Sequence, residues 1–273
     1  MKSMIVTLML SLIFCSVAEA QKKSHRELEG LKGSVRKITE ETINLSEEQG
    51  KWIEAEKGFV TIMVFDRAGN LLEHITYSPI PNSRKLEQLN RSVYSYDSEG
   101  RRTKKEFSDV PIALLPRVAP LPGEAPIPKE EMSPPDVQTR DGATLQTEVD
   151  KFDASGNRVE TITYNGTAEG AMFKRETYNY NEQTRTREKL TYDFRNQLIE
   201  KTIDKFDEQG NLVESLSFDL LFKGMLDTKS RCSDYQFDAK GNWIKMTALS
   251  SDINNNDPAE IEKYIFKRKI TYY

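Results

Sequence analysis

The chain has few side chains suited to nucleophilic or acid–base chemistry, and they are scattered. It contains two histidines, His25 and His74, and two cysteines, Cys15 and Cys232. A Ser-His-Asp or Cys-His centre needs its members within hydrogen-bond reach of one another, and no segment of the sequence suggests such a grouping. His25 falls in a segment expected to be loose, His74 falls on a predicted strand, and Cys232 is expected to be buried and inert. The sequence therefore predicts no catalytic residue of this kind.

Carboxylates are the other candidates, because most glycoside hydrolases use a pair of them. Four glutamates occupy equivalent positions of a repeated segment described below, namely Glu73, Glu160, Glu200 and Glu214. On neighbouring strands they would form an acidic row able to bind a cation or a sugar. Pairing with lysine or arginine across strands would instead neutralise them, and we favour that interpretation. A carbohydrate-active enzyme that uses acids on the face of the sheet is the alternative.

No metal or cofactor site is predicted. The segment DINNNDPAE at 252–260 resembles the first half of a calcium loop, where aspartate and asparagine alternate as oxygen ligands. Such a loop requires glycine at its sixth position and glutamate at its twelfth, and this chain has Asp257 and Lys263 there. The segment is therefore predicted to be a polar hairpin loop. No glycine-rich phosphate loop is present either.

Aromatic residues near the C-terminus offer one further kind of chemistry. Trp243, Tyr264, Tyr272 and Tyr273 could provide a stacking surface for sugars or for a partner strand. Large aromatic side chains in strands more often belong to the core, so we favour a structural role for them.

A repeated phrase gives the clearest structural signal. It consists of an aromatic residue, aspartate, two variable residues, glycine and asparagine, followed by alternating apolar and polar residues. Aspartate can accept hydrogen bonds from the backbone ahead of it, and glycine takes the positive φ that closes a hairpin turn. Asparagine replaces glycine in one copy, which its tolerance of positive φ allows. Six such turns are predicted, at Asp66–Gly69, Asp97–Gly100, Asp153–Gly156, Asp193–Asn196, Asp207–Gly210 and Asp238–Gly241. Tyr180-Asn181 begins a decayed seventh copy.

Alternation on both sides of each turn predicts strands. Further strands are expected at 33–38 and 52–65, joined by a turn near 46–50, and the C-terminal KRKITYY is placed to lie beside its neighbours. A single hairpin is only marginally stable in water, so several must share a buried face. The predicted fold is mainly β: an array of antiparallel β-hairpins in a meander that forms an extended, curved sheet with a proline-rich insertion.

The phrase resembles the YD repeat, also called the Rhs repeat, of bacterial cell-surface and secreted proteins. The six aspartate turns carry the resemblance, which covers about residues 58–107 and 147–273. The segment LKGSVRKI is also similar to the opening of small exported bacterial proteins of unknown function. In large members the repeats curl into a shell around a toxin, whereas this chain is expected to be too short for a closed shell and to carry no toxin domain. The resemblance implies β architecture and an envelope or extracellular location, and it implies no reaction.

The N-terminus is typical of a secretory signal peptide. Lys2 precedes an apolar run at 4–17, and Ala-Glu-Ala follows at 18–20, so residues 1–20 are expected to be removed. The apolar run is too short to span about 30 Å of hydrocarbon as a helix. Lipid attachment at Cys15 is not favoured, because Phe14 stands where a small residue is expected. We therefore expect a periplasmic or extracellular protein without a transmembrane span in the mature chain.

A proline-rich segment divides the mature chain into two blocks. Eight of the eleven prolines lie between Pro111 and Pro135, and proline cannot donate to a sheet ladder. This segment is predicted to be a linker or insertion, with a docking segment for a proline-recognising groove as the alternative. The expected organisation is a signal peptide at 1–20, an N-terminal β-repeat block at 21–107, a proline-rich linker or insertion at 108–140 and a C-terminal β-repeat block at 141–273.

Charge limits the classes of partner. The formal net charge of −4 argues against nucleic acid, whose phosphates require clustered positive charge. The predicted function is a non-enzymatic, exported β-repeat module that binds a partner or has a structural role at the bacterial cell envelope. Another envelope protein or a carbohydrate is the candidate partner, and no cofactor is predicted. A carbohydrate-active enzyme and a companion of a secreted toxin are the alternatives.

Overall fold

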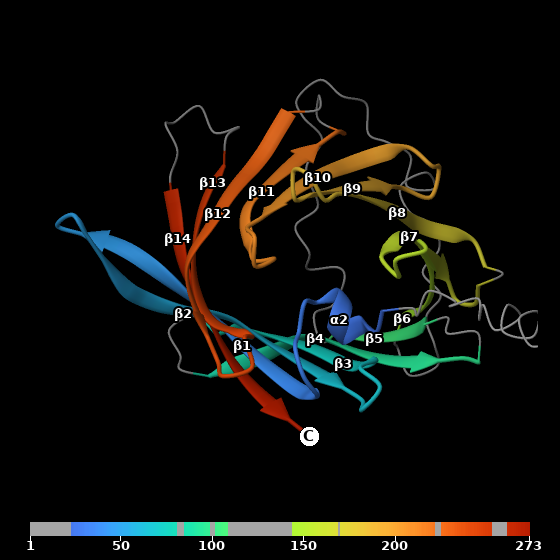
Figure 1. The fold of residues 1–273 in the computed structure, drawn as a ribbon, viewed down its shortest axis with the longest axis horizontal. Coiled ribbons are helices and arrows are strands. Elements are labelled where there is room, and N and C mark those ends of the chain that lie inside the picture. The colour runs from blue at the N-terminus through green and yellow to red at the C-terminus, as the bar shows by residue number, and fades with distance from the viewer. Residues whose placement is uncertain are drawn as a thin grey trace, which may run out of the picture.

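The computed structural model describes residues 23–80, 85–98, 102–108, 144–168, 170–221, 225–252 and 261–273. Over these ranges the chain forms one short helix and fourteen strands, which close into an antiparallel barrel around the helix (Figure 1). The signal peptide, the proline-rich segment and all but the first residue of DINNNDPAE lie outside the described residues.

The elements follow the predicted hairpin order. The helix and strands are α2 (His25–Leu28), β1 (Val35–Glu48), β2 (Lys51–Phe65), β3 (Leu71–Pro79), β4 (Leu86–Tyr96), β5 (Arg102–Ser108), β6 (Thr144–Phe152), β7 (Arg158–Asn165), β8 (Met172–Asn181), β9 (Thr186–Tyr192), β10 (Leu198–Phe206), β11 (Leu212–Asp219), β12 (Met225–Phe237), β13 (Trp243–Asp252) and β14 (Ile261–Tyr272). The prediction of a mainly β, antiparallel fold is confirmed.

The sheet is closed, so the expected extended, curved sheet is wrong. Each strand pairs with the next along the chain, and β14 returns to pair with β1. Ile38 of β1 faces Ile270 of β14 on one side and Met63 of β2 on the other. The C-terminal strand thus covers the edge that an open sheet would leave unpaired. The expectation that the chain is too short for a closed shell is also wrong, because fourteen strands suffice.

Both predicted repeat blocks contribute to this single sheet. Strand β5 precedes residues 109–143 and strand β6 follows them, and the two strands pair directly. Arg102 of β5 faces Glu148 of β6, and Lys104 faces Gln146. The hydrogen-bonded ladder therefore continues from one block into the other.

The aspartate turns share one geometry wherever they are described. Gly69, Gly156, Gly210 and Gly241 have φ between 75° and 94°, and Asn196 has φ 62°. In the turn at Asp207, the carboxylate Oδ1 accepts hydrogen bonds from the backbone N–H groups of Gln209 at 2.9 Å and Asn211 at 2.8 Å. The turns at Asp153, Asp193 and Asp238 repeat both bonds, and Asp66 makes the second one. Gly100 lies outside the described residues.

The turns lie at two ends of the barrel, because successive antiparallel strands run in opposite directions. Those that follow even-numbered strands lie at one end, here called the helix end, and include the turns at 66–70, 153–157, 207–211 and 238–242. The helix lies there too, since the N–H of Arg26 donates to the carbonyl of Gly69 at 2.9 Å. The turn at Asp193 follows odd-numbered β9 and lies at the far end.

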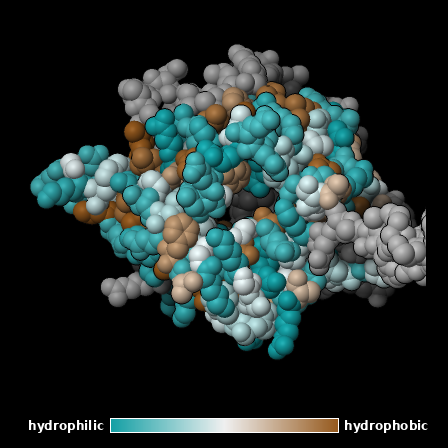
Figure 2. Space-filling view, viewed as in Figure 1, coloured by the Kyte–Doolittle hydropathy of each residue, from teal (hydrophilic) through white to brown (hydrophobic). Residues whose placement is uncertain are grey.

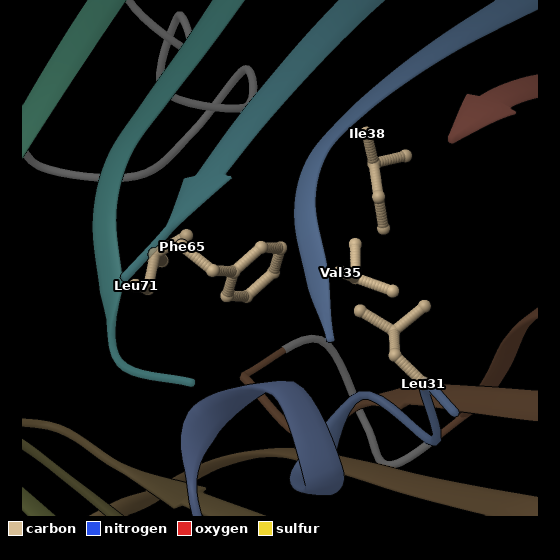
Figure 3. Close-up of a cluster of buried hydrophobic side chains, with 5 residues drawn as sticks. All are labelled: Leu31, Val35, Ile38, Phe65 and Leu71. Atoms are coloured by element: carbon tan, nitrogen blue, oxygen red, sulfur yellow. The ribbon is translucent and has the colours of Figure 1, made fainter. Parts of the chain in front are cut away.

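The buried apolar cluster is small and lies at the helix end. It contains Leu31, Val35, Ile38, Phe65 and Leu71 (Figure 3). Figure 3 shows the Phe65 ring pointing from the end of β2 toward Val35 at the start of β1. This packing ties the segment at 23–34, which we call the N-terminal segment, to the barrel wall.

The first two strands extend beyond their neighbours as a hairpin arm, residues 46–59, seen at the left of Figure 1. The pairing of β1 with β14 ends at Leu45, and that of β2 with β3 begins at Val60. Gln49 and Gly50 form the turn with positive φ, within the predicted range of 46–50. Trp52 lies on this arm and is 37% exposed.

Candidate functional site

Strand register identifies the side chains that face the lumen. Glu40, Arg187, Asp204 and Arg268 line a cavity inside the barrel, which fixes the inward face of their strands. Glu40 faces Arg268 across β1 and β14, and Arg187 faces Asp204 across β9 and β10. Opposed residues share a face and the face alternates along each strand, so many other inward positions are polar. Buried examples are Ser92, Arg102, Thr161, Thr163 and Thr191.

The larger cavity has a volume of about 670 Å³ and lies between the N-terminal segment and the wall formed by β8–β14 and β1. Figure 2 shows this face of the molecule hollowed near its centre, with a largely hydrophilic rim. Four aromatic side chains line the cavity, namely Tyr180, Phe206, Tyr235 and Trp243. The cavity thus combines apolar ring surface with hydrogen-bonding groups.

An arginine held against a tryptophan forms one part of this wall. Arg268 Nε donates to Glu40 Oε2 at 2.7 Å, and the guanidinium carbon lies 3.4 Å from the centroid of the Trp243 ring system. The Tyr235 ring meets Trp243 edge-on, with ring centroids 6.2 Å apart. Stacking and the ion pair together fix the plane of the guanidinium.

A second ion pair lies further along the same wall. Arg187 Nε and Nη2 both donate to Asp204 Oδ2, at 3.1 and 2.7 Å, and Ser215 donates to Oδ1 at 2.8 Å. Burial lowers the pKa of the Arg187 guanidinium, but the hydrogen bond and charge of Asp204 outweigh burial and raise that pKa overall. Both oxygens of Asp204 are therefore engaged by the protein itself.

His25 is packed into the barrel, so the expectation that it lies in a loose segment is wrong. Arg102 Nη1 lies 2.9 Å from His25 Nδ1, and because arginine can only donate, Nδ1 accepts and the ring proton is on Nε2. Burial, followed by the charges of Arg102, Arg158 and His74, lowers the pKa of His25 to about 3. Ser24 and Glu27 form a capping box that fixes the short helix around it.

A smaller cavity of about 330 Å³ lies beside His25, with Tyr96, Arg102 and Asp150 in its lining. Arg102 forms an ion pair with Glu148 and lies 5.1 Å from the centroid of the Tyr94 ring. The charges of Glu148 and Asp150 raise the pKa of Arg102 even though its burial acts to lower it. This cluster anchors the N-terminal segment to the wall.

The asparagine of the repeated phrase has a role that sequence reasoning missed. Asn157 Oδ1 accepts a hydrogen bond from Lys23 Nζ at 2.5 Å. The side-chain amide of Asn242 accepts from the backbone N–H of Lys32 and donates to the backbone carbonyl of Lys32. The same amide also donates to the Tyr272 hydroxyl at 2.8 Å. All four Gly-Asn turns lie at the helix end, whereas the far-end copy has Gln197 in place of asparagine. This difference between copies of the phrase was the sequence signal that could have indicated a role for the asparagine beyond the turn.

The four repeat glutamates form ion pairs, which confirms the interpretation that they are neutralised. The pairs are Glu73–Arg91 at 2.6 Å, Glu160 with Lys151 and with Arg175 at 3.5 Å, Glu200–Lys189 at 3.6 Å, and Glu214–Lys229 at 3.0 Å. Within the described ranges, no three His, Cys, Asp or Glu residues are grouped so that they could hold a metal ion.

Two other residues singled out in the sequence, Cys232 and His74, lie on the inward face of their strands. Cys232 faces Ala248 and is half-buried, and burial raises the pKa of its thiol. His74 lies between Met63 and Ser92 on the neighbouring strands. Among the C-terminal aromatics, Trp243 lines the larger cavity, while the Tyr273 hydroxyl donates to the carbonyl of Phe65 at 2.6 Å.

The outer wall mixes aliphatic and charged side chains. Lys201 and Ile203 alternate with the inward Thr202 and Asp204 along β10, and Lys201 binds Glu188 of β9 at 2.5 Å. Glu73 and Arg91 form a similar outward pair on β3 and β4. None of the described residues belongs to a helix with the length and apolarity that a membrane crossing requires.

Comparison with known proteins assigns no family. No protein-family model and no curated protein matches the chain. Among solved structures, it is similar to a porin-like protein from Bacteroides uniformis, with 8% identity and a TM-score of 0.49 over 88% of this chain and 98% of that one. It is also similar to a protein of unknown function from Bacteroides fragilis, with 21% identity and a TM-score of 0.32 over 46% and 91% of the two chains. A TcdB2–TccC3 chain shows 12% identity and a TM-score of 0.18 over 75% and 11%. The resemblance to YD repeats stays a prediction.

Proposed function

We propose that this protein is an exported, non-enzymatic module that binds a small polar ligand inside its barrel. The larger cavity carries the proposal. Its volume of about 670 Å³ falls within the range of about 300–1,000 Å³ usual for ligand sites. Its lining combines aromatic rings with a few fixed polar groups, as ligand sites commonly do.

The state of the cavity carboxylates supports binding rather than catalysis. Glu40 is bonded to Arg268, and Asp204 is bonded to Arg187 and Ser215. Glu27 is bonded to Ser24 in the capping box, and the fourth lining carboxylate, Glu29, lies 3.8 Å from Nε2 of His25. A glycoside hydrolase needs one carboxyl group that donates a proton and one that attacks or activates water. Three of the four lining carboxylates are engaged by arginine or by the backbone, so the lining offers no free pair for these two tasks.

The outer wall of the barrel and the predicted signal peptide support a location in an aqueous compartment of the cell envelope. An outward Lys or Arg at the midplane of a bilayer costs a transmembrane barrel about 2–4 kcal/mol. This barrel places Lys201, Arg91 and Lys229 among its outward pairs. A barrel surrounded by water accommodates those pairs without that cost, and the predicted signal peptide directs it across the inner membrane.

The chain has two tryptophans, which provides a direct test. In a Trp52→Phe variant, all tryptophan emission arises from Trp243 in the cavity wall. The mature protein is titrated with neutral oligosaccharides, amino acids, nucleotides and dicarboxylates, while Trp243 emission and thermal stability are followed. One class should produce a saturable change, with stabilisation that grows as RT ln(1 + [L]/Kd).

Two results would contradict the proposal. If no class of compound produces a saturable response, the proposed binding function is wrong. Conversion of the bound compound during incubation, detected by mass spectrometry, would show that the protein is an enzyme.

A further inference from the structure

We infer that the ligand is an uncharged, polyhydroxylated molecule of the carbohydrate class, and that Arg268 and Glu40 together bind its adjacent hydroxyl groups. The inference rests on the lumen-binding function proposed above and specifies the ligand of that same cavity.

The charge of the cavity favours an uncharged ligand. Four basic and four acidic side chains line it, so its formal charge is zero. Arg268 is 13% exposed and Glu40 is 21% exposed, so both are shielded from solvent. A charged ligand entering this site would lose hydration without meeting an opposite net charge, which is unfavourable. An uncharged ligand with many hydrogen-bonding groups has no such cost.

The Arg268–Glu40 pair presents a donor beside an acceptor. Their 2.7 Å bond uses Nε of the arginine and Oε2 of the glutamate. Within the described part of the chain, no further hydrogen bond engages the Nη groups of Arg268 or Oε1 of Glu40. A hydroxyl group can donate and accept at once. Neighbouring hydroxyls of a sugar can therefore accept from Nη and donate to Oε1 while the ion pair stays intact.

Charged ligand classes would each meet a like charge at this pair. A carboxylate or phosphate that accepts from the Nη groups of Arg268 would lie beside the Glu40 carboxylate, and an amine that donates to Oε1 of Glu40 would lie beside the guanidinium. Like charges brought together in a shielded site repel each other, which weakens the complex. The same geometry that admits hydroxyl groups thus discriminates against charged compounds.

The aromatic groups complete a site of this kind. Trp243 lies 3.4 Å below the guanidinium of Arg268 and holds it in one orientation before any ligand arrives. Tyr180 lines the same cavity and is 37% exposed, so its ring is available to the apolar C–H face of a sugar. Pre-organised polar groups and an aromatic surface reduce the entropy lost on binding.

The test compares neutral and charged trisaccharides of equal length. Chitotriose with all three amines acetylated is neutral, whereas its deacetylated form is cationic. In the Trp52→Phe protein, maltotriose, cellotriose, mannotriose and both chitotrioses are titrated against Trp243 emission, with trigalacturonate as the anionic probe. At least one neutral trisaccharide should bind. The cationic chitotriose and trigalacturonate should each bind at least about tenfold more weakly than that neutral trisaccharide, equivalent to about 1.4 kcal/mol.

Matched variants assign the site. Arg268→Gln and Glu40→Gln should each weaken the trisaccharide by about tenfold or more. Arg91→Gln and Glu73→Gln remove a similar Nε–carboxylate bond, 2.6 Å long, on the outer wall and should leave the affinity within about twofold. If Arg268→Gln does not fold, Arg268→Lys preserves the charge and removes the planar donor set, and it should still weaken binding.

The outcomes separate this inference from the proposed function. Saturable binding of only charged compounds would overturn the carbohydrate class and leave lumen binding intact. Trisaccharide binding that is unchanged in Arg268→Gln, Glu40→Gln and Arg268→Lys would overturn the assigned residues. No binding by any probe, including the amino acids and nucleotides used above, would overturn both.

Discussion

Asn242 holds Lys32 by both hydrogen-bonding groups of the Lys32 backbone. Asn242 Oδ1 accepts from the N–H of Lys32 at 2.7 Å, and Nδ2 donates to its carbonyl at 2.9 Å. A side-chain amide thereby replaces the neighbouring strand that would otherwise satisfy this backbone. The N-terminal segment is fixed across the helix end of the barrel by a residue more than two hundred positions away.

Replacing that amide should loosen the N-terminal segment. Asn242→Ala removes both of these hydrogen bonds, and each is worth about 0.5–1.5 kcal/mol because Lys32 is exposed and water can replace the amide. We expect a lower free energy of unfolding in urea and faster proteolysis within residues 23–34. Gln197→Ala, at the equivalent position of the far-end turn, is the control and should change stability by less than about 0.5 kcal/mol. Equal effects of the two substitutions would show that the amide does no more than shape its own turn.

Local features of this fold could be predicted from sequence, and closure could not. The Asp-x-x-Gly turn is predictable because its hydrogen bonds lie within five residues, as in the bond from the N–H of Asn211 to Asp207. Closure depends on pairing between Val35 and Tyr272, at opposite ends of the chain. It follows from twist and stagger accumulated over every strand, which no single phrase encodes.

The candidate site was hidden for the same reason. Glu40 and Arg268 are separated by 228 residues, and each has an ordinary charged neighbourhood in the sequence. Their meeting requires the closing pair of strands, so the cavity could be recognised only after the barrel was known. Sequence reasoning favoured a core role for Trp243 over the alternative of a stacking surface, and it did not identify the arginine that lies against this ring.

Two glycines with similar backbone geometry should respond differently to asparagine. Gly69 has φ 94° and Gly210 has φ 84°, so asparagine experiences comparable backbone strain at both. A Cβ at position 69 would lie 2.6 Å from Ser24 Oγ, whereas nothing lies within 4 Å of a Cβ at position 210. Gly210→Asn should cost less than about 1 kcal/mol, as the natural Asn196 suggests, and Gly69→Asn should cost more because Ser24 must move. Thermal melts of both variants measure the two losses of stability. Equal losses would mean that the N-terminal segment can move away from position 69 without an energetic cost.

Stability should fall in acid because His25 is buried in its neutral form. The pKa of this histidine is about 3 in the fold, against a usual value of 6.5 in an unfolded chain. Between these values the unfolded chain binds a proton that the folded protein excludes. The contribution of neutral His25 to the free energy of unfolding is therefore complete above about pH 6.5. It declines as the pH falls toward 3, by at most about 1.4 kcal/mol per pH unit.

His25→Gln isolates this contribution. Glutamine can still accept a hydrogen bond from Arg102 and does not titrate, so the loss of stability between pH 6.5 and pH 4 should be smaller than in the parent. Urea melts across this range provide the measurement. Carboxylates such as Glu27, whose pKa is lowered chiefly by the backbone of Ser24, titrate in both proteins and cancel in the comparison. Parallel curves for the two proteins would indicate that His25 is accessible to protons in the folded state.

The outer wall predicts where the mature protein will be found. Outward pairs such as Lys201–Glu188 and Arg91–Glu73 are compatible with water and unfavourable in hydrocarbon. In a bacterial host, the protein should be released by osmotic shock with its N-terminus at Gln21, and it should partition into the aqueous phase of a detergent cloud-point separation. Replacing Lys201 and Glu188 together by leucine should preserve the fold, because an exposed pair contributes less than about 1 kcal/mol, and should shift partition toward the detergent. Retention of the parent protein in the membrane fraction after salt washing would place this barrel in lipid and contradict the proposed aqueous location.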